Sequence, residues 1–217
     1  MARAFALLLV IAVARPLYGQ TPSATGGDSA VVAAALADSD VTAAIELGQT
    51  RKNGKTFGFL GAADCSNMID AMGGNTRIYG ILAQGPYGRI VDASAQAARK
   101  YMTFGPGDVS AAMRAPTLTV AVQQHLENMK TAVVPVEHVI IRNAAKDGDS
   151  VHIVQPTHHE ELPESYYNLM GAKIETKGVW ATFDPKALPP GDLQFVVILS
   201  NKECNARLRE RDRDKIR

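Results

Sequence analysis

The feature that most constrains the fold is a series of short β-branched runs in the second half of the sequence. These runs, each bounded by turn-forming residues, lie at 117–124, 136–143, 150–156, 177–184 and 193–201. β-branched and aromatic residues favour strands, and short strands between turns favour antiparallel pairing. The second half is therefore predicted to form an antiparallel sheet or a small β-sandwich, for which an immunoglobulin-like shape is one possibility.

The first half of the sequence is richer in helical patterns. Alanine-rich stretches at 29–47 and 87–102 place apolar residues at helical spacing. Extended runs at 56–60 and 77–83 lie between them and are expected to form strands. A helix-rich N-terminal half that leads into a strand-rich C-terminal half predicts the α+β class.

Two helix starts are predicted from polar side chains that can cap a helix. In "ADSD", Ser39 or Asp40 can accept a hydrogen bond from a free backbone N–H of the following turn. Asp108, after the helix-breaking "FGPG", is placed to cap a short helix over "VSAAMR" in the same way.

The stretch "GQTRKNGKT", residues 48–56, has the glycines, lysine and threonine of a phosphate-binding loop in the right order. However, five residues separate Gly48 from Gly54 where the loop needs four, and a helical pattern precedes Gly48 where the loop needs a strand. We therefore interpret Gly48 as the end of a helix and Asn53-Gly54 as a tight turn. No nucleotide site is predicted.

The N-terminus has the pattern of a secretory signal peptide. Arg3 precedes an apolar run at 5–14 that is too short to span a membrane, and small residues offer cleavage after Ala14 or Gly19. The predicted organisation is a signal peptide at 1–19, a flexible lead-in at 20–28, a helix-rich part at 29–114, a β-rich part at 115–206 and a charged tail or edge strand at 207–217. The protein is expected to be secreted or periplasmic, with no transmembrane span after signal removal.

Export bears directly on the two cysteines, Cys65 and Cys204. Thiols in an oxidising compartment more often form a bridge than stay free, so a Cys65–Cys204 disulfide is predicted. The alternatives are free structural thiols and a nucleophile at Cys65, although no signature of a cysteine hydrolase surrounds it.

Charge gives no indication of a nucleic-acid partner. The formal net charge is +1 and the basic residues are spread along the chain, so neither nucleic acid nor an anionic membrane surface is implied.

The densest group of potential metal ligands is "VHIVQPTHHEELPE". His152, His158, His159 and Glu161 are ligand types that suit zinc, and three of them with an open position would make a hydrolytic site. The spacing is poor, because adjacent residues such as His158 and His159 point to different sides of a strand, and no HExxH motif is present. We interpret the segment as a polar loop, with a zinc site as the alternative.

Tyr166 and Tyr167 follow this segment and are the candidate ligand surface, because tyrosines combine flat apolar faces with hydroxyl groups. No serine-hydrolase signature is present. The sequence therefore favours an exported non-catalytic binding or structural module of the periplasm or cell envelope, with a protein, peptide or glycan ligand and no cofactor. The alternative function is a metal-dependent hydrolase or a metal-binding protein.

Overall fold

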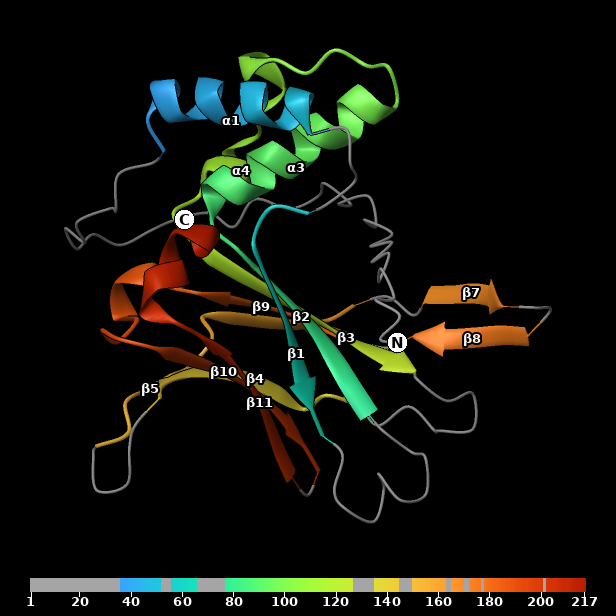
Figure 1. Cartoon of the computed structure of the whole chain (residues 1–217), viewed down its shortest axis with the longest axis vertical. Coiled ribbons are helices and arrows are strands. Elements are labelled where there is room, and N and C mark those ends of the chain that lie inside the picture. The colour runs from blue at the N-terminus through green and yellow to red at the C-terminus, as the bar shows by residue number, and fades with distance from the viewer. Residues whose placement is uncertain are drawn as a thin grey trace, which may run out of the picture. The chain divides into compact units, whose positions relative to one another are not determined.

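The computed structural model describes residues 36–51, 56–65, 77–126, 135–144, 150–162, 165–169, 172–176, 178–200 and 202–217. These residues belong to one compact unit that begins at Val32. They form helices and antiparallel sheets, which confirms the predicted α+β class (Figure 1). The predicted signal peptide, the lead-in and the Asn53-Gly54 turn lie outside the described residues. Within the described ranges, no helix has both the length and the apolar composition that a membrane span needs.

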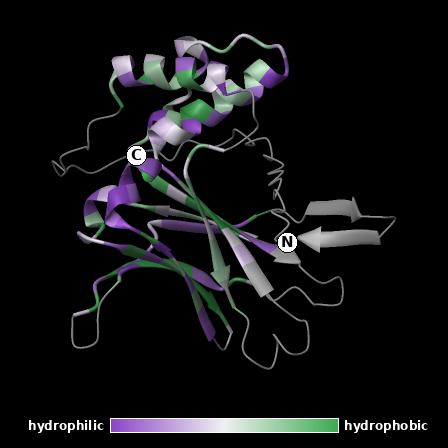
Figure 2. Cartoon of the chain, viewed as in Figure 1, coloured by the Kyte–Doolittle hydropathy of each residue, from purple (hydrophilic) through white to green (hydrophobic). Residues whose placement is uncertain are grey.

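The α-helices of the described residues are α1 (Asp38–Thr50), α3 (Pro86–Arg99) and the short α4 (Ala111–Arg114). Three short 3-10 helices accompany them: η1 (Pro106–Asp108), η2 (Pro185–Ala187) and η3 (Glu210–Ile216). Figure 1 shows α1, α3 and α4 grouped beyond one end of strands β2 and β3. The charged C-terminal stretch is predicted from the sequence to be a tail or an edge strand. Its first residues are the last residues of β11, and the rest forms η3, which is largely hydrophilic in Figure 2.

The strands form two larger sheets and one hairpin. The five-stranded sheet has the order β1 (Phe59–Asp64), β2 (Arg77–Gln84), β3 (Leu118–Leu126), β9 (Gly178–Phe183), β6 (His158–Glu161). The four-stranded sheet has the order β11 (Lys202–Leu208), β10 (Leu193–Leu199), β4 (His138–Asn143), β5 (Ile153–Val154). The hairpin pairs β7 (Ser165–Leu169) with β8 (Ala172–Thr176). All of these pairings are antiparallel.

One apolar core lies between the two larger sheets. Its largest fully buried side chains come from both sheets and from both halves of the sequence: Tyr79, Ile81, Leu118, Ile141, Phe183, Leu193, Phe195 and Leu208. Their strands alternate in side-chain direction, so that every second residue enters the core. The predicted helix-rich and β-rich parts therefore share a core, because β1 and β2 join β3 and β9 in one sheet.

The predicted disulfide is confirmed. Cys65, directly after β1, is bonded to Cys204 on β11, with their Cα atoms 5.1 Å apart and both side chains buried. The Lys202 ammonium donates a hydrogen bond to the Cys65 carbonyl beside the bridge. The bond joins the edge strands of the two sheets. The nucleophile hypothesis for Cys65 is wrong, because its sulfur is already bonded.

α1 differs from its predicted ends in ways that its packing explains. The helix starts at Asp38 after Ala37, with no side-chain cap, so the predicted capping by Ser39 or Asp40 is wrong. It also continues through Gly48 to Thr50, so Gly48 does not end it.

Gly48 instead allows α1 and α3 to approach closely. A Cβ atom at Gly48 would lie 2.5 Å from the Val91 carbonyl oxygen and 2.6 Å from the Ser94 Cβ, which no side chain tolerates. The Ser94 hydroxyl uses this proximity to donate a 2.8 Å hydrogen bond to the Ile45 carbonyl. The glycine is therefore required for helix packing.

The predicted capping role of Asp108 is also wrong. Asp108 lies in η1 and accepts a 2.8 Å hydrogen bond from the Gly105 N–H. Ser110 caps α4 by accepting from the Met113 N–H. The intervening η1 shifts the start of α4, so a serine two residues later takes the role.

Polar side chains of α3 attach the helices to the five-stranded sheet. The Arg89 guanidinium donates to the carbonyls of Ala115, Thr117 and Met113 at 2.6, 2.8 and 3.3 Å, which fixes the segment that leads into β3. Burial lowers the pKa of Arg89 to about 10, so it stays charged at neutral pH. Asp92 accepts from the Phe57 N–H, and burial raises its pKa while this bond opposes the shift.

The C-terminal end of α3 has an unusual residue in its terminating turn. The Tyr101 N–H donates to the Ala98 carbonyl and the Met102 N–H to the Ala97 carbonyl, which is the Schellman pattern of hydrogen bonds. Such a turn needs a left-handed residue, for which glycine is usual. Here Tyr101 takes that conformation with φ of 56°.

Removing the disulfide should destabilise the fold strongly. The bridge closes a loop across a sequence separation of 139 residues, for which the chain-entropy model gives roughly 4 to 5 kcal/mol. We expect Cys65→Ala with Cys204→Ala to lose most of that free energy of unfolding in urea titrations. Reduction of the unmodified protein is the matched control and should give the same loss. Equal stability of the oxidised and reduced protein would contradict this account.

Replacing Tyr101 by glycine should stabilise the protein. A non-glycine residue in the left-handed region costs about 1 to 2 kcal/mol, and Tyr101 is 99% exposed, so no buried contact of its side chain is lost. We expect Tyr101→Gly to raise the free energy of unfolding by about 1 kcal/mol. Tyr101→Ala is the control, because it removes the ring but keeps the strain, and it should change stability little.

Candidate functional site

The two larger sheets are closed differently at their two sides. On one side, the edge strands β1 and β11 pack against each other and share the disulfide. On the other, the chain leaves β5 after Val154, crosses to the second sheet and enters β6 at His158. Thr157 anchors this crossing, because its N–H donates to the Thr182 carbonyl at 2.7 Å. Among the described strands, β5 and β6 are therefore edge strands of these sheets with no further strand paired to them.

β5 presents unpaired backbone groups at its outer edge. The His152 carbonyl accepts from the Asn143 N–H, and the His152 N–H donates to the Asn143 side-chain oxygen at 2.7 Å. Both polar backbone groups of His152 thus face β4. Because an extended strand alternates, those of Val151 and Ile153 face away from β4, and no described residue pairs with them.

The side chains along this edge are unusually apolar for a free strand. Val151 is 54% exposed and Ile153 is 50% exposed, whereas Val154 is buried in the core. The segment 150–155, "SVHIVQ", contains no Lys, Arg, Asp, Glu, Gly or Pro. Natural proteins protect free edges with very short strands, charges, prolines or bulges, and β5 is short, with two residues, but carries no charge. β6 follows that rule, since Glu160 and Glu161 are exposed on it.

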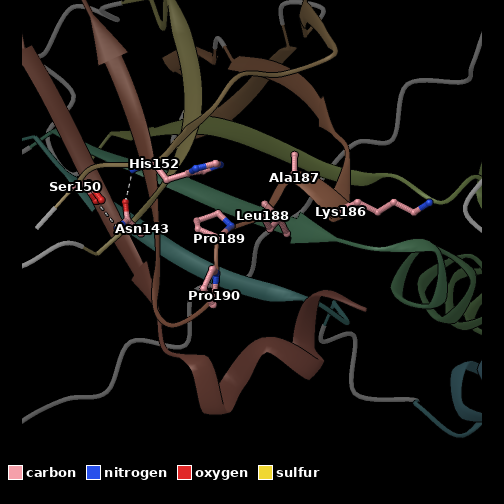
Figure 3. A pocket seen from close by; sticks show the side chains of 8 residues that line it. All are labelled: Asn143, Ser150, His152, Lys186, Ala187, Leu188, Pro189 and Pro190. Carbon is pink, nitrogen blue, oxygen red and sulfur yellow. Dashed lines mark hydrogen bonds between the residues drawn. The ribbon is translucent and has the colours of Figure 1, made fainter. Parts of the chain in front are cut away.

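A pocket of about 460 Å³ lies beside β5 (Figure 3). Asn143, Ser150 and His152 line it from the β4–β5 side, and Lys186, Ala187, Leu188, Pro189 and Pro190 line it from η2 and the segment after it. Figure 3 shows the Lys186 side chain extending away from the other lining residues. The wall opposite His152 is therefore formed mainly by aliphatic and proline side chains, which suits an apolar group of a ligand.

The predicted metal ligands are distributed over different surfaces. His152 lines the pocket, whereas His158, His159 and Glu161 lie on β6. His158 contacts Glu160 at 3.5 Å between Nε2 and Oε2, and His159 lies on the other face of the strand. Within the described ranges, no three side chains of the His, Cys, Asp and Glu types come close enough to hold a metal ion. The zinc alternative stays a prediction without an assembled ligand set.

His159 does meet a histidine of the other sheet. Its ring centroid lies 5.6 Å from that of His138, the first residue of β4. Burial lowers the pKa of His159 and the neighbouring His138 lowers it further, while Glu161 acts in the opposite direction. The His159 Nε2 is buried and makes no hydrogen bond in the described part of the chain. The pair joins the two sheets near the open side of the sandwich.

Tyr166 and Tyr167 lie on β7, opposite Glu175 and Ile174 of β8. The structure describes the backbone of this hairpin only, so the predicted ligand surface stays a prediction. The open edge of β5 was missed in the sequence, although the absence of charge over 150–155 could have indicated it.

No family model, curated protein or solved structure matches this chain.

The lowered pKa of His159 predicts a specific pH dependence. The unfolded chain binds a proton at its usual pKa of 6.5, but the folded protein binds it only at lower pH. The contribution of His159 to the free energy of unfolding is therefore complete above pH 6.5 and decreases as the pH falls toward the lowered pKa. This free energy changes by less than about 1.4 kcal/mol per pH unit. We expect His159→Gln to remove this component in urea titrations across that range. His158→Gln is the control and should keep it, and an identical loss in both variants would contradict the assignment.

Proposed function

We propose that the protein is an exported binding module that takes up an extended polypeptide segment as an additional strand beside β5. The observation that carries this proposal is the uncharged free edge of β5, with Val151 and Ile153 exposed along it. Their outward N–H and carbonyl groups have the spacing of a strand, which the backbone of another extended segment matches. A glycan has no such repeating pattern of backbone donors and acceptors, so the peptide is preferred.

The pocket beside His152 provides a basis for selectivity. In strand addition, backbone hydrogen bonds supply affinity and pockets for alternate side chains supply specificity. One face of a bound strand would place a side chain near Leu188 and Pro189, and the other would place one beside Val151 and Ile153. The favoured ligand is an extended segment with apolar residues at alternate positions.

Export to the periplasm, the cell envelope or the extracellular space is part of this proposal. The N-terminal pattern of a signal peptide supports it. The Cys65–Cys204 bridge supports it as well, because structural disulfides persist in oxidising compartments. The proposal assigns no catalytic step to the chain.

Selection from a phage-displayed library of random peptides tests the proposed function. We expect the enriched peptides to alternate apolar and polar residues and to shift the amide NMR signals of β5. Ile153→Pro removes one outward N–H without touching the bonds to β4, so it should weaken peptide binding by roughly tenfold or more in calorimetry.

Ile153→Val is the matched control, because it keeps a β-branched residue and the backbone N–H, and it should bind like the unmodified protein. Circular dichroism verifies that both variants are folded. Selected peptides that bind equally well to Ile153→Pro, or that shift signals elsewhere in the protein, would refute strand addition at β5.

A further inference from the structure

The end of α3 combines strain with exposure in one residue. Tyr101 has φ of 56° and is the sole non-glycine residue with positive φ in the part of the chain that the structure describes. Its side chain is 99% exposed, and Met102 beside it is 61% exposed. The tyrosine therefore adopts an unfavourable conformation without a compensating buried contact within the chain.

The other described residues with positive φ are glycines. Gly191 has φ of 77°, and a Cβ atom there would meet nothing within 4 Å, so space alone does not select the residue. A glycine at 101 would end α3 in the same way. The exposed ring is therefore what distinguishes Tyr101 from a glycine at this position.

Basic residues gather beside this exposed pair. Arg99 is in the last turn of α3 and the exposed Lys100 follows it. Arg51, which follows α1, is engaged elsewhere, because its guanidinium lies 5.4 Å from the centroid of the Phe57 ring. The Gln49 side chain also donates to the Phe104 carbonyl at 3.4 Å, which links the end of α1 to the segment after Met102. We call Arg99, Lys100, Tyr101 and Met102 the α3 tip.

The form of the α3 tip determines which partner it fits. A stable protein interface buries about 800 Å² on each partner, far more than two exposed apolar side chains provide. A bilayer surface needs no complementary shape, and tyrosine is enriched at membrane–water interfaces because its ring is apolar and its hydroxyl is polar. Cations next to such a residue attract anionic headgroups.

We propose that the α3 tip binds the surface of an anionic phospholipid bilayer, with Tyr101 and Met102 at the interface and Arg99 and Lys100 against the headgroups. The overall charge of +1 gives no sign of this site, because the site uses only two cations that are adjacent in the sequence. The proposal is independent of peptide binding, since the α3 tip and β5 share no residue.

Co-sedimentation with vesicles tests the proposal. One set contains phosphatidylcholine alone and the other contains equal parts of phosphatidylcholine and phosphatidylglycerol. We expect the purified protein to bind the anionic vesicles, to release them as salt is raised and to bind the phosphatidylcholine vesicles far less. Arg99→Gln with Lys100→Gln should lower the partition coefficient by roughly 30-fold, at about 1 kcal/mol for each cation near the surface.

Tyr101→Asn tests the ring without changing the backbone conformation, because asparagine tolerates the left-handed region. It should lower the partition coefficient by roughly tenfold, which corresponds to the loss of about 60 Å² of inserted apolar surface. Two matched controls should bind like the unmodified protein. Leu60→Asn removes another exposed apolar side chain, and Arg209→Gln with Arg211→Gln removes exposed cations at the C-terminus.

Three outcomes would overturn the proposal. The first is absence of binding to the anionic vesicles. The second is equal binding to both sets of vesicles, which would exclude the role of the cations. The third is equal binding by the tip variants and the controls, which would place the membrane contact elsewhere on the chain.

Discussion

The packing of the two sheets against each other, closed by the Cys65–Cys204 bond, is the constraint on which the rest of the structure depends. A half-buried sheet is stable only when its apolar face is covered, and here each sheet covers the other. The bond joins β1 to β11, so the two edges at that side protect each other. On the opposite side, the chain crosses from β5 to β6, and the His138 and His159 rings meet between the sheets. The proposed strand addition uses this side, where β6 carries charges and β5 does not.

The helices depend on the same framework. Only Gly85 separates β2 from α3, and the Arg89 guanidinium holds the chain just before β3. The start of α3 is thus fixed to two neighbouring strands, while its middle is anchored to α1 through Gly48 and Ser94. Because both contacts leave the final turn uncovered, the residues after Arg99 reach solvent. The exposure of the α3 tip is a consequence of where the helix is held.

Sequence reasoning identified the features that arise from local chemistry. The β-branched runs became β3, β4, β5, β9 and β10, and the two cysteines formed the predicted bond. It failed where a distant contact decides the outcome. Gly48 resembles a helix end, but its role is set by Val91, more than forty residues away. The histidines of 152–159 are close in sequence, yet folding separates His152 from β6 and brings His159 to His138. The left-handed tyrosine could not be predicted, because no sequence rule places such a residue at a helix end.

Both proposed contact surfaces depart from rules that the same chain obeys elsewhere. The β6 edge carries glutamates, whereas β5 has none. Gly191 adopts a positive φ without strain, whereas Tyr101 adopts one at an energetic cost. A single substitution would remove either departure, and neither Ile153 nor Tyr101 belongs to the buried core. Packing therefore gives no reason for Ile153 or Tyr101 to be what they are. A contact outside the chain gives a reason for each residue. The two contacts differ in chemistry: the edge beside Ile153 fits a peptide backbone, whereas the exposed ring of Tyr101 fits a charged membrane surface.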